Sequence, residues 1–313
     1  MLIQADARQI PLQDGCVQCV VTSPPYWAKR DYGHARQIGL EPQLEVYVSE
    51  LVLVFHEISR VLKSDGVAWL NLGDAYVNPD KGWYQSCRVK AEDSLQKGNL
   101  GSDFVGAPNR QPQAGLKPKD LAMVPFRVAL ALQADGWWVR RDIPWAKGVS
   151  FCDSWSGSVM PENVADRPST SHEYVFMLTK AANYYYDAKA VQERGVWPAG
   201  TVAAKGSGTR EGNRRKADYA TYSGVRNLRS VWAIPVEPST HEHQAPMPEA
   251  LVRPCILATS RPGDLVYDPF IGSGTVARVA ERLGRRWVGT DLSFHDLAAE
   301  RTAQRGLRFE VTA

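Results

Sequence analysis

The sequence lacks most of the features that would place it in a specialised structural class. Its 313 residues include only five cysteines, too few for a disulfide framework in a chain of this length. Cys16 and Cys19 have metal-like spacing, but no second Cys or His pair stands nearby, so we interpret them as core residues and expect no metal. No apolar run approaches the roughly 20 residues of a membrane span, and no basic-then-apolar leader opens the chain. We therefore expect a cytoplasmic protein without membrane contact.

A strong net charge is also absent, although the charge is unevenly distributed. The chain carries +3 overall, and its 44% hydrophobic and 23% charged residues are ordinary for a globular protein. Lys81 to Lys119 contains seven basic and three acidic residues, and Lys189 to Ser230 contains nine and three. These two segments together carry +10, which leaves −7 on the rest of the chain. A basic excess confined to two irregular segments of an acidic body is typical of a polyanion-binding face.

A short β-branched run that ends in two prolines is the first informative stretch. Val17–Val21 predicts a buried strand, and Thr22-Ser23-Pro24-Pro25-Tyr26-Trp27 follows it directly. The two prolines stiffen the exit from the strand, and because they have no N–H, the carbonyls of Ser23 and Pro24 can accept other hydrogen bonds. Rigid acceptors beside the Tyr26 ring suit the capture of a planar group that carries an NH₂. An ordinary strand-ending turn is the alternative.

A glycine-rich turn near the other end of the chain is the second informative stretch. Asp264–Thr275 predicts a strand that feeds such a turn, and a short helix follows until Gly284. This arrangement holds nucleotide-like ligands in doubly wound folds. The next predicted strand, Trp287–Asp291, ends in an acid seventeen residues after Gly274. That spacing is close to the roughly 20 residues expected for a carboxylate that binds ribose hydroxyls.

Together the two stretches resemble the amino-group DNA methyltransferases that use S-adenosyl-L-methionine. Asp268–Thr275 is similar to their cofactor loop, and Ser23–Tyr26 is similar to their catalytic tetrapeptide in the form most often seen in cytosine-N4 enzymes. The catalytic motif precedes the cofactor motif, as in the permuted beta group. The resemblance implies an α/β fold: a Rossmann-like, doubly wound mixed sheet with permuted motif order, plus basic loop insertions forming a small DNA-recognition region.

The resemblance also implies roles for individual residues. Ser23 and the Pro24 carbonyl would bind the target amine, and Tyr26 would stack on the extruded base. Asp6, after a strand expected over Met1–Ala5, resembles the acid that accepts a hydrogen bond from the adenine of the cofactor; a solvated turn acid is the alternative. The predicted catalytic residues are Ser23, Pro24, Pro25 and Tyr26, and the predicted cofactor-binding residues are Asp6, Asp268, Pro269, Phe270, Gly272, Gly274, Thr275 and Asp291.

The expected partner is double-stranded DNA. The predicted DNA-binding residues lie in the second basic segment, which could instead be a solvated loop: Lys205, Arg210, Arg214, Arg215 and Lys216. The resemblance further suggests a bacterial or phage origin and a cognate restriction endonuclease that acts separately, and it allows a homodimer.

We expect the chain to be organised in five parts. These are the catalytic half (1–80), a basic insertion (81–119), a continuation of the sheet (120–188), a target-recognition segment (189–230) and the cofactor-binding half (231–313). Helices are predicted over Leu44–Leu62, Leu121–Ala134 and Ala250–Thr259, and strands over Val67–Leu72, Trp137–Trp145 and Glu173–Thr179. Asp74, which follows one strand, and His172, which precedes another, are weaker site candidates.

Several other functions compete with cytosine-N4 methylation. Adenine-N6 enzymes usually carry Asp or Asn where this chain has Ser23, so adenine is the main alternative base. Cytosine-C5 methylation needs a thiolate, and the Pro254-Cys255 pair falls within a predicted helix far from the catalytic strand. A dinucleotide oxidoreductase would need a third glycine after Gly274. Methylation of RNA or of protein amides, and non-catalytic nucleic-acid binding, are more remote.

Overall fold

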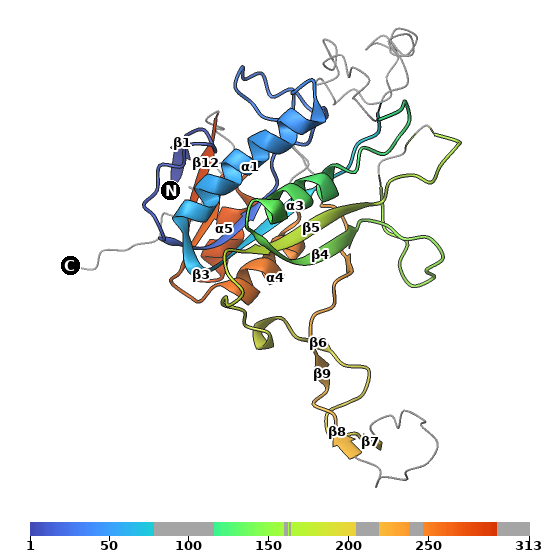
Figure 1. The fold of residues 1–313 in the computed structure, drawn as a ribbon. Coiled ribbons are helices and arrows are strands. Elements are labelled where there is room, and N and C mark those ends of the chain that lie inside the picture. Colours follow the sequence, from blue (N-terminus) through green and yellow to red (C-terminus); the bar gives the residue numbers. More distant parts are fainter. Residues whose placement is uncertain (78–115, 160–161, 163, 205–218, 238–246, 293–313) are drawn as a thin grey trace, which may run out of the picture.

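The structure is a computed structural model that describes residues 1–77, 116–159, 162, 164–204, 219–237 and 247–292 (Figure 1). Almost all of the first basic segment and the centre of the second therefore lie outside the described residues. The same holds for the predicted DNA-binding residues Lys205, Arg210, Arg214, Arg215 and Lys216.

A mixed sheet of eight strands forms the centre of the described part of the chain, in the order β1-β12-β11-β2-β3-β5-β4-β10. The strands are β1 (Leu2–Gln4), β2 (Val17–Thr22), β3 (Leu62–Leu72), β4 (Trp138–Ala146), β5 (His172–Thr179), β10 (Trp232–Ala233), β11 (Leu265–Asp268) and β12 (Arg286–Asp291). Neighbours from β1 to β3 are parallel, and β5 runs antiparallel to both β3 and β4. The carboxyl ends of the parallel strands therefore meet the amino end of β5 at one edge, where open α/β sheets place their ligands.

Helices cover both faces of the sheet (Figure 1). Helices α1 (Leu44–Val61) and α3 (Val124–Ala134) pack on one face, and α4 (Glu249–Thr259) and α5 (Thr275–Arg282) pack on the other. Successive residues of a strand point to opposite faces, so Val20 of β2 joins the core under α1 while Val21 joins the core under α4 and α5. This arrangement is the doubly wound α/β fold that the sequence predicts.

Two predicted boundaries are wrong. Lys63–Gly66 does not separate α1 from the next strand, because β3 already begins at Leu62, which pairs with Val17 across a β-bulge. Helix α3 begins at Val124 instead of Leu121, because Leu121 forms a bridge with Tyr76. Proline is favoured in the first turn of a helix, and Pro125 occupies that place.

The described parts of the second basic segment, 189–204 and 219–230, contain short strands that the sequence did not predict. After a 3₁₀ turn (η3, Lys189–Val191), β6 (Glu193–Arg194) pairs with β9 (Val225–Arg226), and β7 (Val202–Ala204) pairs with β8 (Tyr219–Thr221). The two strand pairs project away from the central sheet (Figure 1).

Within the described ranges, no helix is both long and apolar enough to cross a membrane. No cluster of three or more His, Cys, Asp or Glu side chains among the same residues could hold a metal ion. Cys19 and Cys255 are buried in the core under α4 and α5.

Candidate active site

The Ser23–Tyr26 turn leaves β2 at the ligand-binding edge and is fixed by its neighbours. Trp27 is buried, and its indole Nε1 donates to the Glu41 carbonyl at 2.9 Å. On α1, the Tyr47 hydroxyl donates to the Pro25 carbonyl at 3.0 Å. Because prolines stiffen the turn and these bonds hold its far end, the direction of the Ser23 side chain is set by the backbone.

A network of side chains joins this turn to the next two strands. Tyr26 donates its hydroxyl proton to Glu173 Oε2 at 2.6 Å. Asn71 Nδ2 donates to the Tyr26 hydroxyl at 2.8 Å, to Glu173 Oε2 at 2.9 Å and to Ser23 Oγ at 3.4 Å. Ser23 Oγ lies 3.3 Å from the Tyr26 hydroxyl and donates to it. The other Glu173 oxygen, Oε1, forms an ion pair with Lys147.

Strand register explains why these residues meet. Asn71 lies near the carboxyl end of β3, where Leu72 pairs with Tyr174 of the antiparallel β5. Glu173 therefore lies at the same edge, one residue before Tyr174. Lys147 follows β4 directly, and its N–H donates to the Ser171 carbonyl.

The Tyr26 ring is half-buried and has little room around it. A Cβ atom on Gly73 would lie 2.7 Å from Tyr26 Cε2, so a residue with a side chain there would push the ring. Burial, and next the charge of Glu173, raise the pKa of the Tyr26 hydroxyl well above its usual value. The hydroxyl therefore stays protonated and remains a donor. Stacking of Tyr26 on an extruded base stays a prediction.

The second predicted turn leaves β11, the strand beside β2. The Asp268 carboxylate is buried and accepts hydrogen bonds from Thr22 Oγ1 at 2.8 Å and from the Phe270 N–H at 3.0 Å. The first bond joins the ends of β2 and β11 directly. Burial raises the pKa of Asp268 to about 7, and the nearby charge of Asp291 adds to the increase.

Backbone geometry shapes the glycine-rich part of this turn. Gly272 and Gly274 have φ angles of 45° and 78°, in the left-handed region that favours glycine. The Gly272 N–H donates to Asp291 Oδ2 at 3.2 Å, which links the turn to the end of β12. A Cβ on Gly289 would lie 2.5 Å from Ile271 Cγ1, so β12 needs a glycine there to let the turn approach.

Two other predicted cofactor-binding residues, Pro269 and Thr275, take part in the packing of this turn. The Pro269 carbonyl accepts a hydrogen bond from Thr290 Oγ1 at 3.2 Å, and the Thr290 hydroxyl also binds the Tyr267 hydroxyl at 2.7 Å. Thr275 is buried as the first residue of α5.

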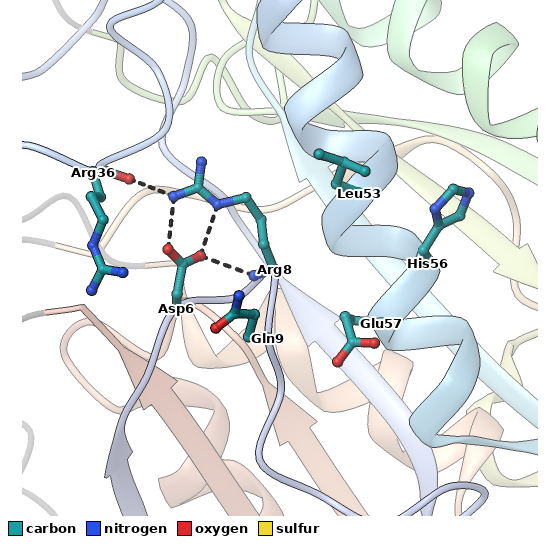
Figure 2. A pocket seen from close by; sticks show the side chains of 7 residues that line it. All are labelled: Asp6, Arg8, Gln9, Arg36, Leu53, His56 and Glu57. Atoms are coloured by element: carbon teal, nitrogen blue, oxygen red, sulfur yellow. Dashed lines mark hydrogen bonds and ion pairs between the residues drawn. The ribbon is translucent and has the colours of Figure 1, made fainter.

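Asp6 follows β1 at the same edge, since the Ala5 N–H donates to the Asp291 carbonyl at 2.9 Å. Its carboxylate binds the Arg8 guanidinium at 2.9 and 2.7 Å (Figure 2). Although burial acts in the opposite direction, the hydrogen bonds and charge of Arg8 lower the pKa of Asp6. Both oxygens are thus held by a cation. A contact between Asp6 and the adenine of a cofactor stays a prediction.

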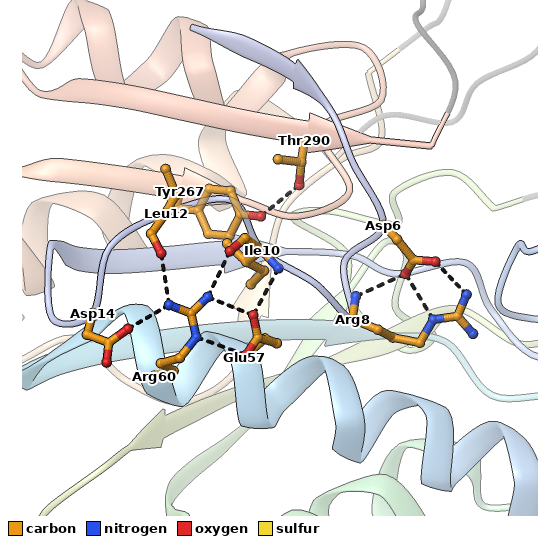
Figure 3. A network of polar contacts seen from close by, with 9 residues as sticks. All are labelled: Asp6, Arg8, Ile10, Leu12, Asp14, Glu57, Arg60, Tyr267 and Thr290. Carbon is orange, nitrogen blue, oxygen red and sulfur yellow. Dashed lines mark hydrogen bonds and ion pairs between the residues drawn. The ribbon is translucent and has the colours of Figure 1, made fainter.

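A shallow pocket of about 480 Å³ lies beside this pair, and no residue of the Ser23–Tyr26 turn lines it. Its lining consists of Asp6, Arg8, Gln9, Arg36, Leu53, His56 and Glu57 (Figure 2). Farther along the β1–β2 connection, Arg60 of α1 binds Glu57, Asp14 and the carbonyls of Ile10 and Leu12 (Figure 3). These contacts hold the connection against α1.

The two weaker site candidates, Asp74 and His172, make contacts that stabilise the fold. Asp74 accepts the N–H of Val124 at 2.9 Å and of Ala75 at 2.8 Å, so it caps the start of α3. His172 is exposed, and its ring packs edge-on against Tyr174 with the centroids 5.2 Å apart.

Sequence reasoning missed three members of the network, Asn71, Lys147 and Glu173. Asn71 is a polar residue inside a strand that is otherwise apolar from Val67 to Leu72, which is a usable signal. Glu173 stands next to the candidate His172 but was assigned only to the strand. Lys147 has no local signal.

The fold and these two turns together are typical of an enzyme that holds a nucleotide-like cofactor beside a second ligand. A glycine-rich turn between a strand and a helix, with an acid on the next strand, is built to hold a nucleotide-like cofactor. The rigid Pro-Pro turn on the neighbouring strand offers polar groups to a second ligand at the same edge of the sheet.

Comparison with known proteins narrows this class. A family model described as DNA methylase, of the N6/N4 methyltransferase type, matches residues 17–299. The chain is 42% identical over 304 residues to the type II methyltransferase M.Cfr9I of Citrobacter freundii, which covers 96% of this chain and 86% of that protein. It is 40% identical over 308 residues to M.SmaI of Serratia marcescens, with coverage of 97% and 91%. The chain therefore belongs to the N6/N4 DNA methylase family, as the two motifs predicted.

Solved structures confirm the fold. The cytosine-N4-specific PvuII DNA methyltransferase matches with a TM-score of 0.62 at 17% identity, over 99% of this chain and 87% of that one. TTHA0409 of Thermus thermophilus, a putative DNA modification methylase complexed with S-adenosyl-L-methionine, matches with a TM-score of 0.56 at 22% identity, over 98% and 95%.

Proposed function

We propose that this DNA methylase transfers a methyl group from S-adenosyl-L-methionine to the exocyclic N4 amine of cytosine in double-stranded DNA. One observation carries the proposal. The Ser23–Tyr26 turn and the glycine-rich turn leave neighbouring parallel strands, and the Thr22–Asp268 hydrogen bond of 2.8 Å joins them. A methyl donor held by one turn would therefore lie beside an amine held by the other.

The residues of the glycine-rich turn fit such a cofactor. Gly272 and Gly274 let the backbone approach a ligand closely, and Asp291 offers a carboxylate for ribose hydroxyls at the end of the next strand. Asp268 and Asp291 add acidic groups near a ligand that carries positive charge on sulfur. When bound, the cofactor supplies a methyl group activated by that sulfonium.

The residues of the catalytic turn fit an exocyclic amine. Methyl transfer to nitrogen is a direct displacement, so the protein mainly positions the amine and excludes water. Ser23 and the Pro24 carbonyl would accept the N–H groups of the amine, which helps it become pyramidal. Tyr26 would stack on the flipped base, and stacking is worth about 1–3 kcal/mol. That is comparable to the few kcal/mol that flipping costs.

No cysteine nucleophile is needed, in agreement with the surroundings of Cys255. Its thiol is buried within α4 and donates to the Leu251 carbonyl at 3.3 Å. Burial raises its pKa well above the usual value, which disfavours the thiolate that cytosine-C5 methylation requires. Cys255 therefore supports amine methylation over ring methylation.

The choice of cytosine rests on Ser23. A serine hydroxyl is shorter than an Asp or Asn side chain, and because its proton is donated to the Tyr26 hydroxyl, its oxygen is free to accept an N–H of the target amine. N6-methylation of adenine is the competing outcome, because adenine offers the same local pattern of NH₂ beside a ring nitrogen.

The remaining proposals concern partners. We infer that 189–230 is the target-recognition segment and that Lys205, Arg210, Arg214, Arg215 and Lys216 contact DNA phosphates. The relatives M.Cfr9I and M.SmaI are named as type II methyltransferases, which supports a cognate restriction endonuclease acting separately. A homodimer stays a prediction.

Nucleoside analysis tests the reaction. Genomic DNA from a host without DNA methyltransferases, carrying either the gene or an empty vector, would be digested to nucleosides and measured by mass spectrometry. We expect N4-methylcytosine only with the gene. N6-methyladenine alone would refute the choice of base, and identical nucleosides in both samples would refute DNA methylation.

A further inference from the structure

The hydrogen bonds that link Ser23, Tyr26 and Glu173 each donate toward Glu173. Ser23 Oγ donates to the Tyr26 hydroxyl at 3.3 Å, and the Tyr26 hydroxyl donates to Glu173 Oε2 at 2.6 Å. Glu173 is the end of this sequence, because an ionised carboxylate only accepts. A proton that arrives at Ser23 therefore has a continuous path to Glu173.

Asn71 fixes this direction. Its Nδ2 lies 2.9 Å from Glu173 Oε2, and an amide oxygen in that place would face the carboxylate, so the NH₂ group must point into the network. The same NH₂ donates to the hydroxyls of Tyr26 and Ser23. Each hydroxyl oxygen thus accepts from Asn71, and its own proton is directed onward toward Glu173.

Lys147 pairs with Glu173 at the end of the path. Its ammonium pairs with Glu173 Oε1 and lies 4.7 Å from the centre of the Trp145 ring, which also favours the cation. The side chains of Lys147 and Glu173 are 23% and 14% exposed, so water can reach this end of the network. A proton delivered to Glu173 can leave from there without returning past Ser23.

We propose that Glu173 takes up the proton that the target amine loses, through the hydroxyls of Ser23 and Tyr26. This inference rests on the proposed function, in which the amine nitrogen forms a bond to the methyl group as the sulfur–methyl bond breaks. The nitrogen then passes one proton to Ser23 Oγ while the Ser23 proton moves to Tyr26 and the Tyr26 proton moves to Glu173 Oε2. The protonated Glu173 releases that proton to water, and the network returns to its starting state.

Three substitutions test this path at different points. Glu173→Gln replaces the acceptor with an amide, Tyr26→Phe removes the central hydroxyl but keeps the ring, and Glu173→Asp keeps a carboxylate. Single-turnover methylation of unmethylated plasmid DNA would be measured, because product release often limits steady-state rates. Calorimetry of S-adenosyl-L-methionine binding and thermal melting would accompany each variant.

We expect Glu173→Gln and Tyr26→Phe each to lower the single-turnover rate by about 10²-fold, within the range for proton transfer by a positioned side chain. Cofactor affinity and melting temperature should stay near those of the wild type. Glu173→Asp should restore most of the rate lost in Glu173→Gln, because it keeps a carboxylate that can accept the proton. The double variant should be no slower than either single variant, because both interrupt one path.

Asp264→Asn is the matched control, since Asp264 is another partly buried carboxylate paired with a lysine, Lys63, at 3.0 Å, and it lies just before β11, at the end of that strand away from both turns. It should keep the wild-type rate. The proton path would be overturned if Glu173→Gln kept the wild-type rate, if Glu173→Asp were as slow as Glu173→Gln, or if the losses of Glu173→Gln and Tyr26→Phe multiplied in the double variant. A wild type that transfers no methyl group would overturn the proposed function and the path with it.

Discussion

The two turns at the ligand-binding edge are built in different ways, although their strands are neighbours. The turn after β11 is made by backbone groups and by side chains close in sequence: Phe270 donates to Asp268 two residues away, and Gly272 donates to Asp291 nineteen residues away. The turn after β2 depends on residues distant in sequence, because Tyr26 binds Asn71 and Glu173, which lie 45 and 147 residues away along the chain.

This difference predicts different sensitivities to mutation. The glycine-rich turn depends on backbone angles and on space, so a substitution there should change cofactor affinity first. The Ser23–Tyr26 turn depends on side-chain hydroxyls aligned by three strands, so a substitution there should change the rate with little effect on affinity. Variants that separate rate from affinity therefore test whether the two turns act independently.

Ser23→Ala should have the largest effect. It removes the hydroxyl that would face the target amine, and we expect the single-turnover rate to fall by about 10²–10³-fold, as when a positioned hydrogen-bonding group is removed from other active sites. Cofactor affinity by calorimetry should stay near wild type. Ser49→Ala is the control, because the Ser49 hydroxyl donates within α1, to the Glu45 carbonyl at 2.9 Å. A full rate in Ser23→Ala would contradict the proposed mechanism.

Asp291→Ala should show the opposite behaviour. It removes both the predicted ribose contact and the acceptor of the Gly272 N–H, so cofactor binding should weaken by about 1.5–3 kcal/mol, the range for hydrogen bonds to charged groups. The single-turnover rate at saturating cofactor should change much less. Asp291→Asn, which keeps an oxygen for Gly272, should lose less affinity than Asp291→Ala. Unchanged affinity in a folded Asp291→Ala protein would remove Asp291 from the cofactor site.

Gly73→Ala tests the Ser23–Tyr26 turn by crowding the Tyr26 ring, without removing a polar group. Its new Cβ would lie 2.7 Å from Tyr26 Cε2, so the ring must shift and its bond to Glu173 must lengthen. We expect a loss of about 1–3 kcal/mol in unfolding free energy, typical of overpacking, together with a slower single turnover. Urea unfolding and rate measurements on the same protein check both effects.

Gly289→Ala is the counterpart of this variant in the other turn. Its Cβ would lie 2.5 Å from Ile271, so it crowds the glycine-rich turn to a similar degree. It should weaken cofactor binding while Gly73→Ala leaves that binding intact. If both variants lost rate and affinity alike, the two turns would form one unit, and the comparison would fail.

The sequence predicted most of the fold because its strands are short apolar runs that end in glycine, proline or acid. The start of β3 was wrong for a tertiary reason. Lys63–Gly66 has the composition of a turn, but the pairing of Leu62 with Val17 across a bulge draws those residues into the strand. Local composition does not reveal a bulge, because the bulge depends on the partner strand.

Some parts of the candidate site could be predicted from the sequence, and others could not. The glycine-rich turn was predictable since its strand, turn, helix and acid follow one another within 265–291. Lys147 and Glu173 were missed because they enter the site through the register of β4 and β5 with their neighbours, and no motif encodes that register. Asn71 could have been found as a buried polar residue at the end of a parallel strand.

The smallest predicted effect concerns Asp268, which belongs to both turns through its bond to Thr22. Its pKa is about 7 in the folded protein, above the usual value for an aspartate, so the folded state binds a proton that the unfolded state has already lost. The stabilisation from this proton is complete below about pH 4 and disappears as the pH rises through about 7. The slope contributed by this one group is at most about 1.4 kcal/mol per pH unit.

Asp268→Asn removes this titration and keeps an amide oxygen that can accept the bonds from Thr22 and the Phe270 N–H. Compared with the wild type, the variant should therefore gain stability as the pH rises from about 5 to about 8, as measured by urea unfolding at several pH values. Asp14→Asn is a suitable control, because Asp14 is 79% exposed in its pair with Arg60. Parallel stability curves for wild type and Asp268→Asn would mean that the carboxylate between the two strands keeps an ordinary pKa, and that the junction of the two turns is more open to water than its burial indicates.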